Sequence, residues 1–179
     1  MSDWQHTVIP GVLRALTPTA QDPRGSFTEL WRASRWEHLT DQRFVQANLS
    51  RSEARVLRGM HFHRRQADLW VLVEGAAFVA VYDLRGPAEA DPTPSADTFD
   101  MQPGDAVLIP SGVAHGFYAT EPMALVYLVT AEYDGSDERG FAWDDPDAGI
   151  QWPARDPILS DRDAANPDLK SALAALRRG

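Results

Sequence analysis

The sequence predicts an all-β fold, a sandwich or barrel of short strands, and three observations support this. Apolar or alternating runs of a few residues recur along the chain, they are rich in β-branched and aromatic side chains, and clusters of Gly, Pro, Asp and Ser separate them. At 179 residues the chain has the size of one domain, and we find no repeat and no sign of a second domain. We therefore expect residues 1–179 to form a single domain.

The expected strands follow one another from the N-terminus, with turns such as VEGAA and QPGDA between them. They are VIPGVLRALTP from Val8, the strand that follows the turn DPRGSF from Asp22, FVQANLS from Phe44, VLRGMHFH from Val56, LWVLVEG from Leu69, AAFVAVYDLR from Ala76, DAVLIPSG from Asp105 and MALVYLVTAEY from Met123.

Two segments favour helix. SRWEHLTDQ, from Ser34, has the length of a short helix after the first strands. In the C-terminal PDLKSALAALRRG, Leu169, Leu173 and Leu176 recur at helical spacing, with a proline near the start and arginines near the end. The Pro-, Ala- and Asp-rich stretch 86–98 is expected to be an exposed loop between two strands.

Composition excludes several classes of protein. The net charge of −9, from 17 basic and 26 acidic residues, repels nucleic acid and anionic membranes, so we expect neither as a partner. The chain has no cysteine, which excludes disulfides, thiolate zinc sites and cysteine nucleophiles. We find no signal peptide at the N-terminus and no apolar run of the roughly 18–20 residues that a membrane span needs. These features predict a cytoplasmic protein.

Two histidines one residue apart are the first candidate functional feature. Alternate side chains of a strand point to the same face, so His61 and His63 are expected to face one side together, and inside a barrel they would face one cavity. Asp68 follows shortly after. An alternative is that His63 and Asp68 lie at a strand end and a turn in contact with solvent, because a polar RRQ segment follows His63.

This segment and a later one, GDAVLIPSGVAHGF, resemble the paired motifs of the cupin superfamily. The first motif is matched by His61, His63, Asp68 and Gly75. The second is matched by Gly104, Pro110, Gly112 and His115, although Ala119 stands where an asparagine is usual. Cupins are jelly-roll β-barrels, so the resemblance implies an all-β cupin jelly-roll with short peripheral helices. In metal-binding cupins the three histidines and the acidic residue are the ligands, which makes His61, His63, Asp68 and His115 a candidate site for a divalent metal ion.

A longer resemblance, from about residue 8 to residue 169, is to the dTDP-4-dehydrorhamnose 3,5-epimerase family, a branch of the cupins. The matching stretches are DPRGSFTELW, FVQANLSRSEARVLRGMHF, VYDLR, IPSGVAHGF, VYLVTAEYDGSDERGFAWDDPD, IQWP and ILSDRD. The resemblance implies an isomerase that acts on a dTDP-linked 4-keto-6-deoxyhexose, requires no cofactor and forms a homodimer.

The resemblance also implies roles for individual residues. His61 matches the histidine that abstracts a proton, Asp163 the carboxylate that pairs with it, and Tyr127 the tyrosine that delivers a proton from the opposite face. Tyr133 matches an aromatic position that stacks against the nucleotide. The remaining substrate-contacting positions are Arg24, Glu29, Gln46, Asn48, Arg58, His115, Glu138 and Arg162.

These residue types suit the implied chemistry. Removing a proton from carbon beside a ketone needs a well-placed base and stabilisation of the enolate. Histidine titrates near neutrality, and a carboxylate behind it fixes its tautomer. Arginines bind diphosphate through charge-assisted hydrogen bonds. From the residues alone, two alternatives stay open: Tyr127 as a core tyrosine, and Asp163 as the cap of a turn.

The chain departs from the epimerase pattern at two positions. Asp68 stands where the family usually has a lysine, expected over the developing enolate oxygen, and His63 stands where the family tends to have a neutral residue. Three hypotheses follow: a sugar-nucleotide epimerase in which another group, such as Arg58, stabilises the enolate; a metal-dependent cupin enzyme; and a non-catalytic sugar-nucleotide binding protein. The first two compete for His61, because a nitrogen bound to a metal cannot accept a substrate proton.

Overall fold

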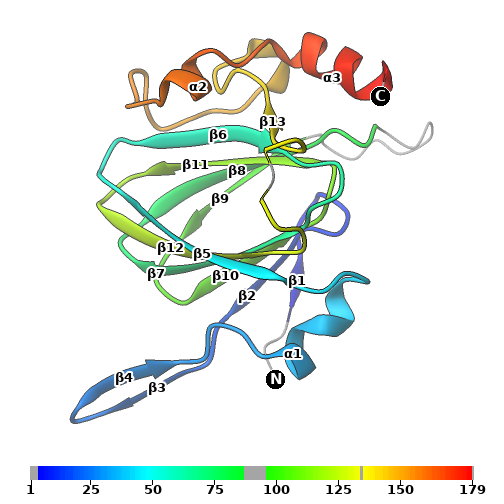
Figure 1. The fold of residues 1–179 in the computed structure, drawn as a ribbon. Coiled ribbons are helices and arrows are strands. Elements are labelled where there is room, and N and C mark those ends of the chain that lie inside the picture. Colours follow the sequence, from blue (N-terminus) through cyan, green and yellow to red (C-terminus); the bar gives the residue numbers. More distant parts are fainter. Residues whose placement is uncertain (1–3, 87–95, 134, 179) are drawn as a thin grey trace.

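The computed structural model describes residues 4–86, 96–133 and 135–178. In this part of the chain two antiparallel sheets face each other, and a two-stranded hairpin projects away from them (Figure 1). The six-stranded sheet has the order β1-β2-β10-β7-β12-β5 and the five-stranded sheet the order β13-β6-β11-β8-β9. The all-β prediction is confirmed.

The strands and helices have the following bounds. The strands are β1 (Gln5–His6), β2 (Leu13–Leu16), β3 (Thr19–Asp22), β4 (Gly25–Thr28), β5 (Gln46–Ser52), β6 (Leu57–Phe62), β7 (Asp68–Glu74), β8 (Ala77–Asp83), β9 (Ala96–Met101), β10 (Asp105–Ile109), β11 (Val113–Ala119), β12 (Met123–Val129) and β13 (Arg139–Gly140). The helices are α1 (Ala33–Trp36), α2 (Asp161–Ala164) and α3 (Leu169–Arg178), with short 3-10 helices η1 (Glu37–Leu39) and η2 (Pro146–Ala148).

The central strand β7 shows why the sequence forms a layered structure. Its apolar run is buried on both faces: Trp70 and Leu72 point into the core between the sheets, whereas Leu69 and Val71 point to the outer side. There they pack in a cluster with Trp36 of α1. A strand covered on both faces is expected to be continuously apolar rather than alternating.

The C-terminal region covers the other sheet. Leu169 and Ala172 of α3 pack in one cluster with Met60 and Phe62 of β6. Figure 1 shows α2 and α3 on the side of the five-stranded sheet where β6 lies. Both expected helical segments are confirmed, the first as the short pair α1 and η1. None of the helices in the described part of the chain is long and apolar enough to cross a membrane.

Glycine is required where β7 turns into β8. Gly75 has a φ of +76°, and a Cβ at this position would lie 2.1 Å from the carbonyl oxygen of Pro122. Only a residue without a side chain fits this left-handed turn against neighbouring backbone. The chain passes through this turn from β7 in the six-stranded sheet to β8, which begins at Ala77 in the five-stranded sheet.

Some predicted boundaries were wrong. The opening segment forms a strand only from Leu13 to Leu16, because Pro10 and Gly11 make a turn before it. Residues 87–95 of the expected loop lie outside the described residues, but its last residues, from Ala96, begin β9. This strand was missed because it is polar and lies at a sheet edge, where only Phe99 and Met101 are buried.

Candidate active site

A cavity of about 450 Å³ lies between the two sheets and collects most of the candidate residues. Strands β5, β7 and β12 line it on one side and β6 and β11 on the other, and side chains from Tyr133, Glu138 and the segment that begins at Ser160 complete it. The residues that line it are Gln46, Asn48, Ser50, Arg58, His61, His63, Gln66, Asp68, Trp70, His115, Phe117, Leu125, Tyr127, Val129, Tyr133, Glu138, Ser160, Arg162 and Asp163.

His61 on β6 is paired with Asp163. The His61 Nε2 atom lies 2.5 Å from Asp163 Oδ1, and the Asp163 carboxylate is almost fully buried. If Nε2 carries the hydrogen that Asp163 accepts, Nδ1 of the same ring holds the lone pair of a base. The contact joins residues 102 positions apart in sequence.

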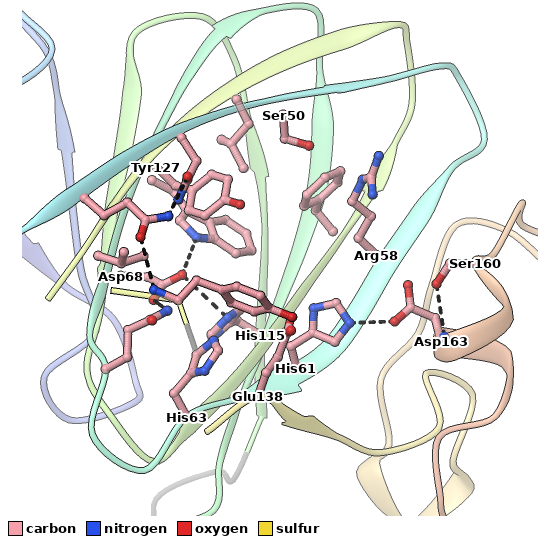
Figure 2. A pocket seen from close by; sticks show the side chains of 18 of the residues that line it. Ser50, Arg58, His61, His63, Asp68, His115, Tyr127, Glu138, Ser160 and Asp163 are labelled. Carbon is pink, nitrogen blue, oxygen red and sulfur yellow. Dashed lines mark hydrogen bonds and ion pairs between the residues drawn. The ribbon is translucent and has the colours of Figure 1, made fainter. Parts of the chain in front are cut away.

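The segment that carries Asp163 is fixed by its own capping bond. The backbone N–H of Asp163 donates to Ser160 Oγ at 3.1 Å at the start of α2, so the serine caps the helix and the aspartate side chain is directed to His61 (Figure 2). Burial raises the pKa of Asp163, but the hydrogen bond and charge of His61, with Ser160 and Arg162, outweigh burial and lower it below the usual value. The carboxylate is therefore ionised at neutral pH.

Tyr127 approaches the cavity from the opposite sheet. It lies on β12, half-buried, and packs against the core between the sheets, whereas His61 lies on β6 of the facing sheet. Burial raises the pKa of Tyr127, the charges of Asp68 and Glu138 raise it further, and Arg58 acts in the opposite direction. The phenol is therefore protonated at neutral pH and able to donate a proton.

Charged and polar side chains surround this pair. Arg162 Nη1 lies 2.6 Å from Glu138 Oε1, and Arg58 Nε donates to Ser52 Oγ at 3.0 Å. Gln46 organises a further group: its Nε2 donates to Asn48 Oδ1 at 2.8 Å, and its Oε1 accepts from the backbone N–H of Tyr133 at 3.1 Å. The Tyr133 side chain itself is 68% exposed, so its ring is accessible to a ligand.

A second polar cluster, which we call the His63 cluster, consists of His63, Asp68 and His115. One potential ligand atom from each of the three lies within 4.8 Å of the other two. His63 follows β6 directly and Asp68 begins β7, but they are only 9% and 4% exposed. The alternative that both lie at strand ends in contact with solvent is right about the strand ends but wrong about the solvent, since both side chains are buried and line the cavity.

The candidate metal ligands thus divide into two groups. His61 and His63 line the same cavity, but His61 pairs with Asp163. Among the described residues, the ligand atoms that lie together are those of the three residues of the His63 cluster.

Burial, together with the charges of His63 and His61, lowers the pKa of His115 to about 4 in spite of the opposing charge of Asp68. His115 is therefore a neutral imidazole at neutral pH.

Two predicted substrate-contacting residues lie elsewhere. Arg24 is at the turn of the projecting β3–β4 hairpin, paired with Asp22, and Glu29 follows that hairpin and pairs with Arg32 and Arg35. Neither lines the cavity of the same chain. Figure 1 shows the hairpin extending away from the two sheets.

Sequence reasoning did not single out several lining residues. Trp70 and Gln66 donate to Asp68, at 3.1 and 2.8 Å, and Ser160 caps the helix of Asp163. The alternation of β7 carried a signal for Trp70, because it puts Asp68, Trp70 and Leu72 on one face. Ser160 and Gln66 belong to loops, whose side-chain directions follow no sequence period.

Comparisons with known proteins agree on one family. A family profile described as dTDP-4-dehydrorhamnose 3,5-epimerase matches residues 6–171. The dTDP-4-dehydrorhamnose 3,5-epimerase of Salmonella typhimurium is 34% identical over 174 residues, covering 93% of this chain and 95% of that protein. The dTDP-4-dehydrorhamnose 3-epimerase of Streptomyces niveus is 35% identical over 161 residues, covering 87% of this chain and 78% of that protein.

A solved structure gives the same result for the fold. The structure of the Legionella pneumophila dTDP-6-deoxy-D-glucose-3,5-epimerase in complex with dTDP-4-keto-L-rhamnose superposes with a TM-score of 0.86 at 30% identity, covering 97% of each chain. The predicted cupin-type fold is thereby confirmed.

Proposed function

The chain belongs to the dTDP-4-dehydrorhamnose 3,5-epimerase family, and on this premise we propose that it epimerises a dTDP-linked 4-keto-6-deoxyhexose with His61 as base and Tyr127 as acid. One observation carries the assignment of these residues. His61, paired with Asp163 of α2, and Tyr127 project from facing sheets into one cavity (Figure 2).

The first step is removal of a proton from carbon beside the ketone. His61 Nδ1 accepts this proton, and Asp163, held at 2.5 Å from Nε2, fixes the tautomer and stabilises the imidazolium that forms. The electrons of the broken C–H bond pass to the ketone oxygen, which becomes an enolate. Arg58 lines the same cavity and is the cation we assign to this charge.

Inversion requires that the carbon regain a proton from its other face. Tyr127 belongs to the opposite sheet and its raised pKa keeps the phenol protonated. It donates its proton to the carbon, the enolate electrons form the new C–H bond and the ketone is restored with the configuration inverted. The Tyr127 phenolate then regains a proton from solvent and the His61 imidazolium releases one to it. A base and an acid on facing sheets provide the two-sided arrangement that an epimerisation needs.

The nucleotide part is assigned to the polar rim of the cavity. Arg162 supplies positive charge for a diphosphate in a chain whose net charge is −9. Tyr133, whose backbone N–H is held by Gln46, offers an exposed aromatic face on which the nucleobase of the substrate can stack. Asn48 and Glu138 add hydrogen-bonding groups beside them.

The reaction is tested by hydrogen exchange. Incubating the protein with dTDP-4-keto-6-deoxyglucose in deuterated water is expected to place deuterium at C3, at C5 or at both, since each abstracted proton is replaced from solvent. NMR spectroscopy reads the two carbons separately and so distinguishes a 3-epimerase from a 3,5-epimerase. Lack of exchange at both carbons, with and without added divalent metal, would contradict an epimerase and favour a sugar-nucleotide binding protein.

We also propose that the active form is a homodimer in which the β3–β4 hairpin reaches a partner. The hairpin leaves the sheets, and Phe27 on β4 is 75% exposed, which leaves an apolar side chain without cover in the single chain. Arg24 at its turn is distant from its own cavity, and a second copy would allow it to reach a neighbouring one.

The dimer has two measurable consequences. Light scattering is expected to give about twice the chain mass of 19.8 kDa. Arg24→Ala is expected to raise KM by about tenfold with little change in kcat, because a charge-assisted hydrogen bond to bound substrate is worth about 1.5 kcal/mol. Arg14→Ala, on β2 and outside the lining residues of the cavity, is the matched control. A monomer whose KM is insensitive to Arg24 would contradict the proposal.

A further inference from the structure

We propose that the His63 cluster binds one divalent first-row transition-metal ion, beside the base His61 but without it. The cluster offers two imidazole nitrogens and a carboxylate oxygen within 4.8 Å of one another. Two atoms that each lie about 2.1 Å from one ion are at most about 4.2 Å apart. Small side-chain movements would therefore bring the three atoms to a common ion.

The strongest evidence is a pair of electron-pair donors that face each other in a buried place. His115 Nδ1 lies 3.1 Å from the carbonyl oxygen of Val113, so Nδ1 carries the hydrogen and Nε2 the lone pair. Nε2 lies 3.8 Å from Asp68 Oδ2, too far for a hydrogen bond. Both residues are at most 5% exposed. A cation between the two atoms would satisfy both.

The polar neighbours hold the ligands in the required orientation. The Asp68 carboxylate accepts from Trp70 Nε1 at Oδ2 and from Gln66 Nε2 at Oδ1, while the remaining nitrogen of His115 is bonded to a backbone carbonyl. Metal-binding histidines in proteins usually donate their second ring N–H to such a group, and ligating carboxylates are themselves hydrogen-bonded.

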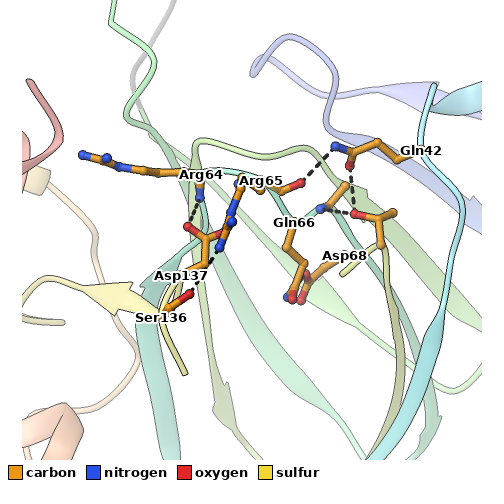
Figure 3. A network of polar contacts seen from close by, with 9 residues as sticks. Gln42, Arg64, Arg65, Gln66, Asp68, Ser136 and Asp137 are labelled. Atoms are coloured by element: carbon orange, nitrogen blue, oxygen red, sulfur yellow. Dashed lines mark hydrogen bonds and ion pairs between the residues drawn. The ribbon is translucent and has the colours of Figure 1, made fainter. Parts of the chain in front are cut away.

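The loop between His63 and Asp68 is also fixed at several points (Figure 3). The backbone N–H groups of Arg64 and Arg65 donate to the Asp137 carboxylate, and Gln42 Nε2 donates to the Arg65 carbonyl. At its end the N–H of Ala67 donates to Thr130 Oγ1. Preorganised ligands lose less conformational entropy when they bind, so this fixation favours a defined site.

His61 has a different partner and is therefore left out of the site. Its Nε2 is bonded to Asp163 at 2.5 Å, and it is absent from the group of ligand atoms that lie together among the described residues. The base and the metal site can thus coexist. Two imidazoles and a carboxylate favour ions such as Fe²⁺, Co²⁺, Ni²⁺ and Zn²⁺ over Mg²⁺.

Metal binding is tested directly, without any sugar. Untagged protein freed of metal with a chelator is titrated with Co²⁺, whose visible absorption reports coordination by the protein, and with Zn²⁺ in a calorimeter. One equivalent per chain is expected. His63→Gln and Asp68→Asn are each expected to weaken binding of Co²⁺ and Zn²⁺ by about 100-fold or more. Mg²⁺ at the same concentration is expected to give no heat of binding in the calorimeter.

His61→Gln is the matched control, because it removes a neighbouring histidine of the same cavity. It is expected to keep the Co²⁺ affinity within about threefold. Less than a tenth of an equivalent bound by the wild-type chain would overturn the proposal, and so would an equal loss of affinity in His61→Gln. Circular dichroism of each variant verifies that its loss of binding is not a loss of fold.

This test is independent of the epimerase reaction. A chain that exchanges deuterium but binds no metal would refute the metal site alone. A chain that binds metal in the His63 cluster but exchanges no deuterium would refute the epimerase alone.

Discussion

Replacing His61 by glutamine is expected to lower the rate of deuterium exchange into the sugar by about 10²–10⁴-fold, the usual contribution of a general base. The amide nitrogen of glutamine can take the place of His61 Nε2 and keep donating to Asp163, so the segment around Ser160 is expected to stay in position. What the variant lacks is the lone pair at the position of Nδ1. The experiment therefore removes the base while keeping its support.

Exchange at C3 and C5 is followed by NMR under saturating substrate, and KM is expected to change little. His38→Gln is the matched control, because His38 is exposed and does not line the cavity; its rate is expected to equal that of the wild type. If His61→Gln retained more than a tenth of the wild-type rate, another group would be the base.

The sequence predicts the parts of the site that depend on strand geometry. The two histidine-containing segments form the neighbouring strands β6 and β11, with His115 directly opposite His61 in the antiparallel register. Alternation along a strand predicts that His61 and His63 share a face, and the resemblance to the paired cupin motifs implies that His115 faces the same cavity.

The pairing of His61 and Asp163 could be predicted only through resemblance to a family. Asp163 belongs to a short helix after a long irregular segment, and its position depends on how the C-terminal region packs over β6. Neither spacing nor periodicity contains that information. The same holds for Arg24, whose distance from the cavity results from a hairpin that leaves the sheets.

The separation of His61 from His63 could not be derived from alternation either. The strand ends at Phe62, and after it the hydrogen bonds of the loop to Asp137 and Gln42 decide where His63 and Asp68 lie. A continuous strand would point His61 and His63 to the same face, but in the structure they have different partners. His61 is bonded to Asp163, whereas His63 lies beside His115 and Asp68.

Tyr127→Phe is expected to separate exchange from inversion. Without the phenol, His61 can still remove the proton and return a deuteron to the same face after exchanging with solvent, since its side chain is 19% exposed. Inversion is expected to fall by about 10²-fold or more, while exchange with retained configuration falls by less than about tenfold. The ratio of exchange to inversion therefore rises.

Both quantities are obtained from one reaction in deuterated water, with NMR for deuterium at each carbon and the chemical shifts of the remaining ring protons, compared with those of the authentic epimers, for the configuration. Tyr82→Phe is the matched control: Tyr82 packs against Phe141 in the outer cluster with α3, away from the cavity, and its loss is expected to leave the ratio unchanged. An equal loss of exchange and inversion in Tyr127→Phe would contradict the assignment, because a group that acts only on the second face cannot be needed for proton removal on the first. A raised ratio would in turn place the base and the acid on opposite faces of the sugar, as the two facing sheets require.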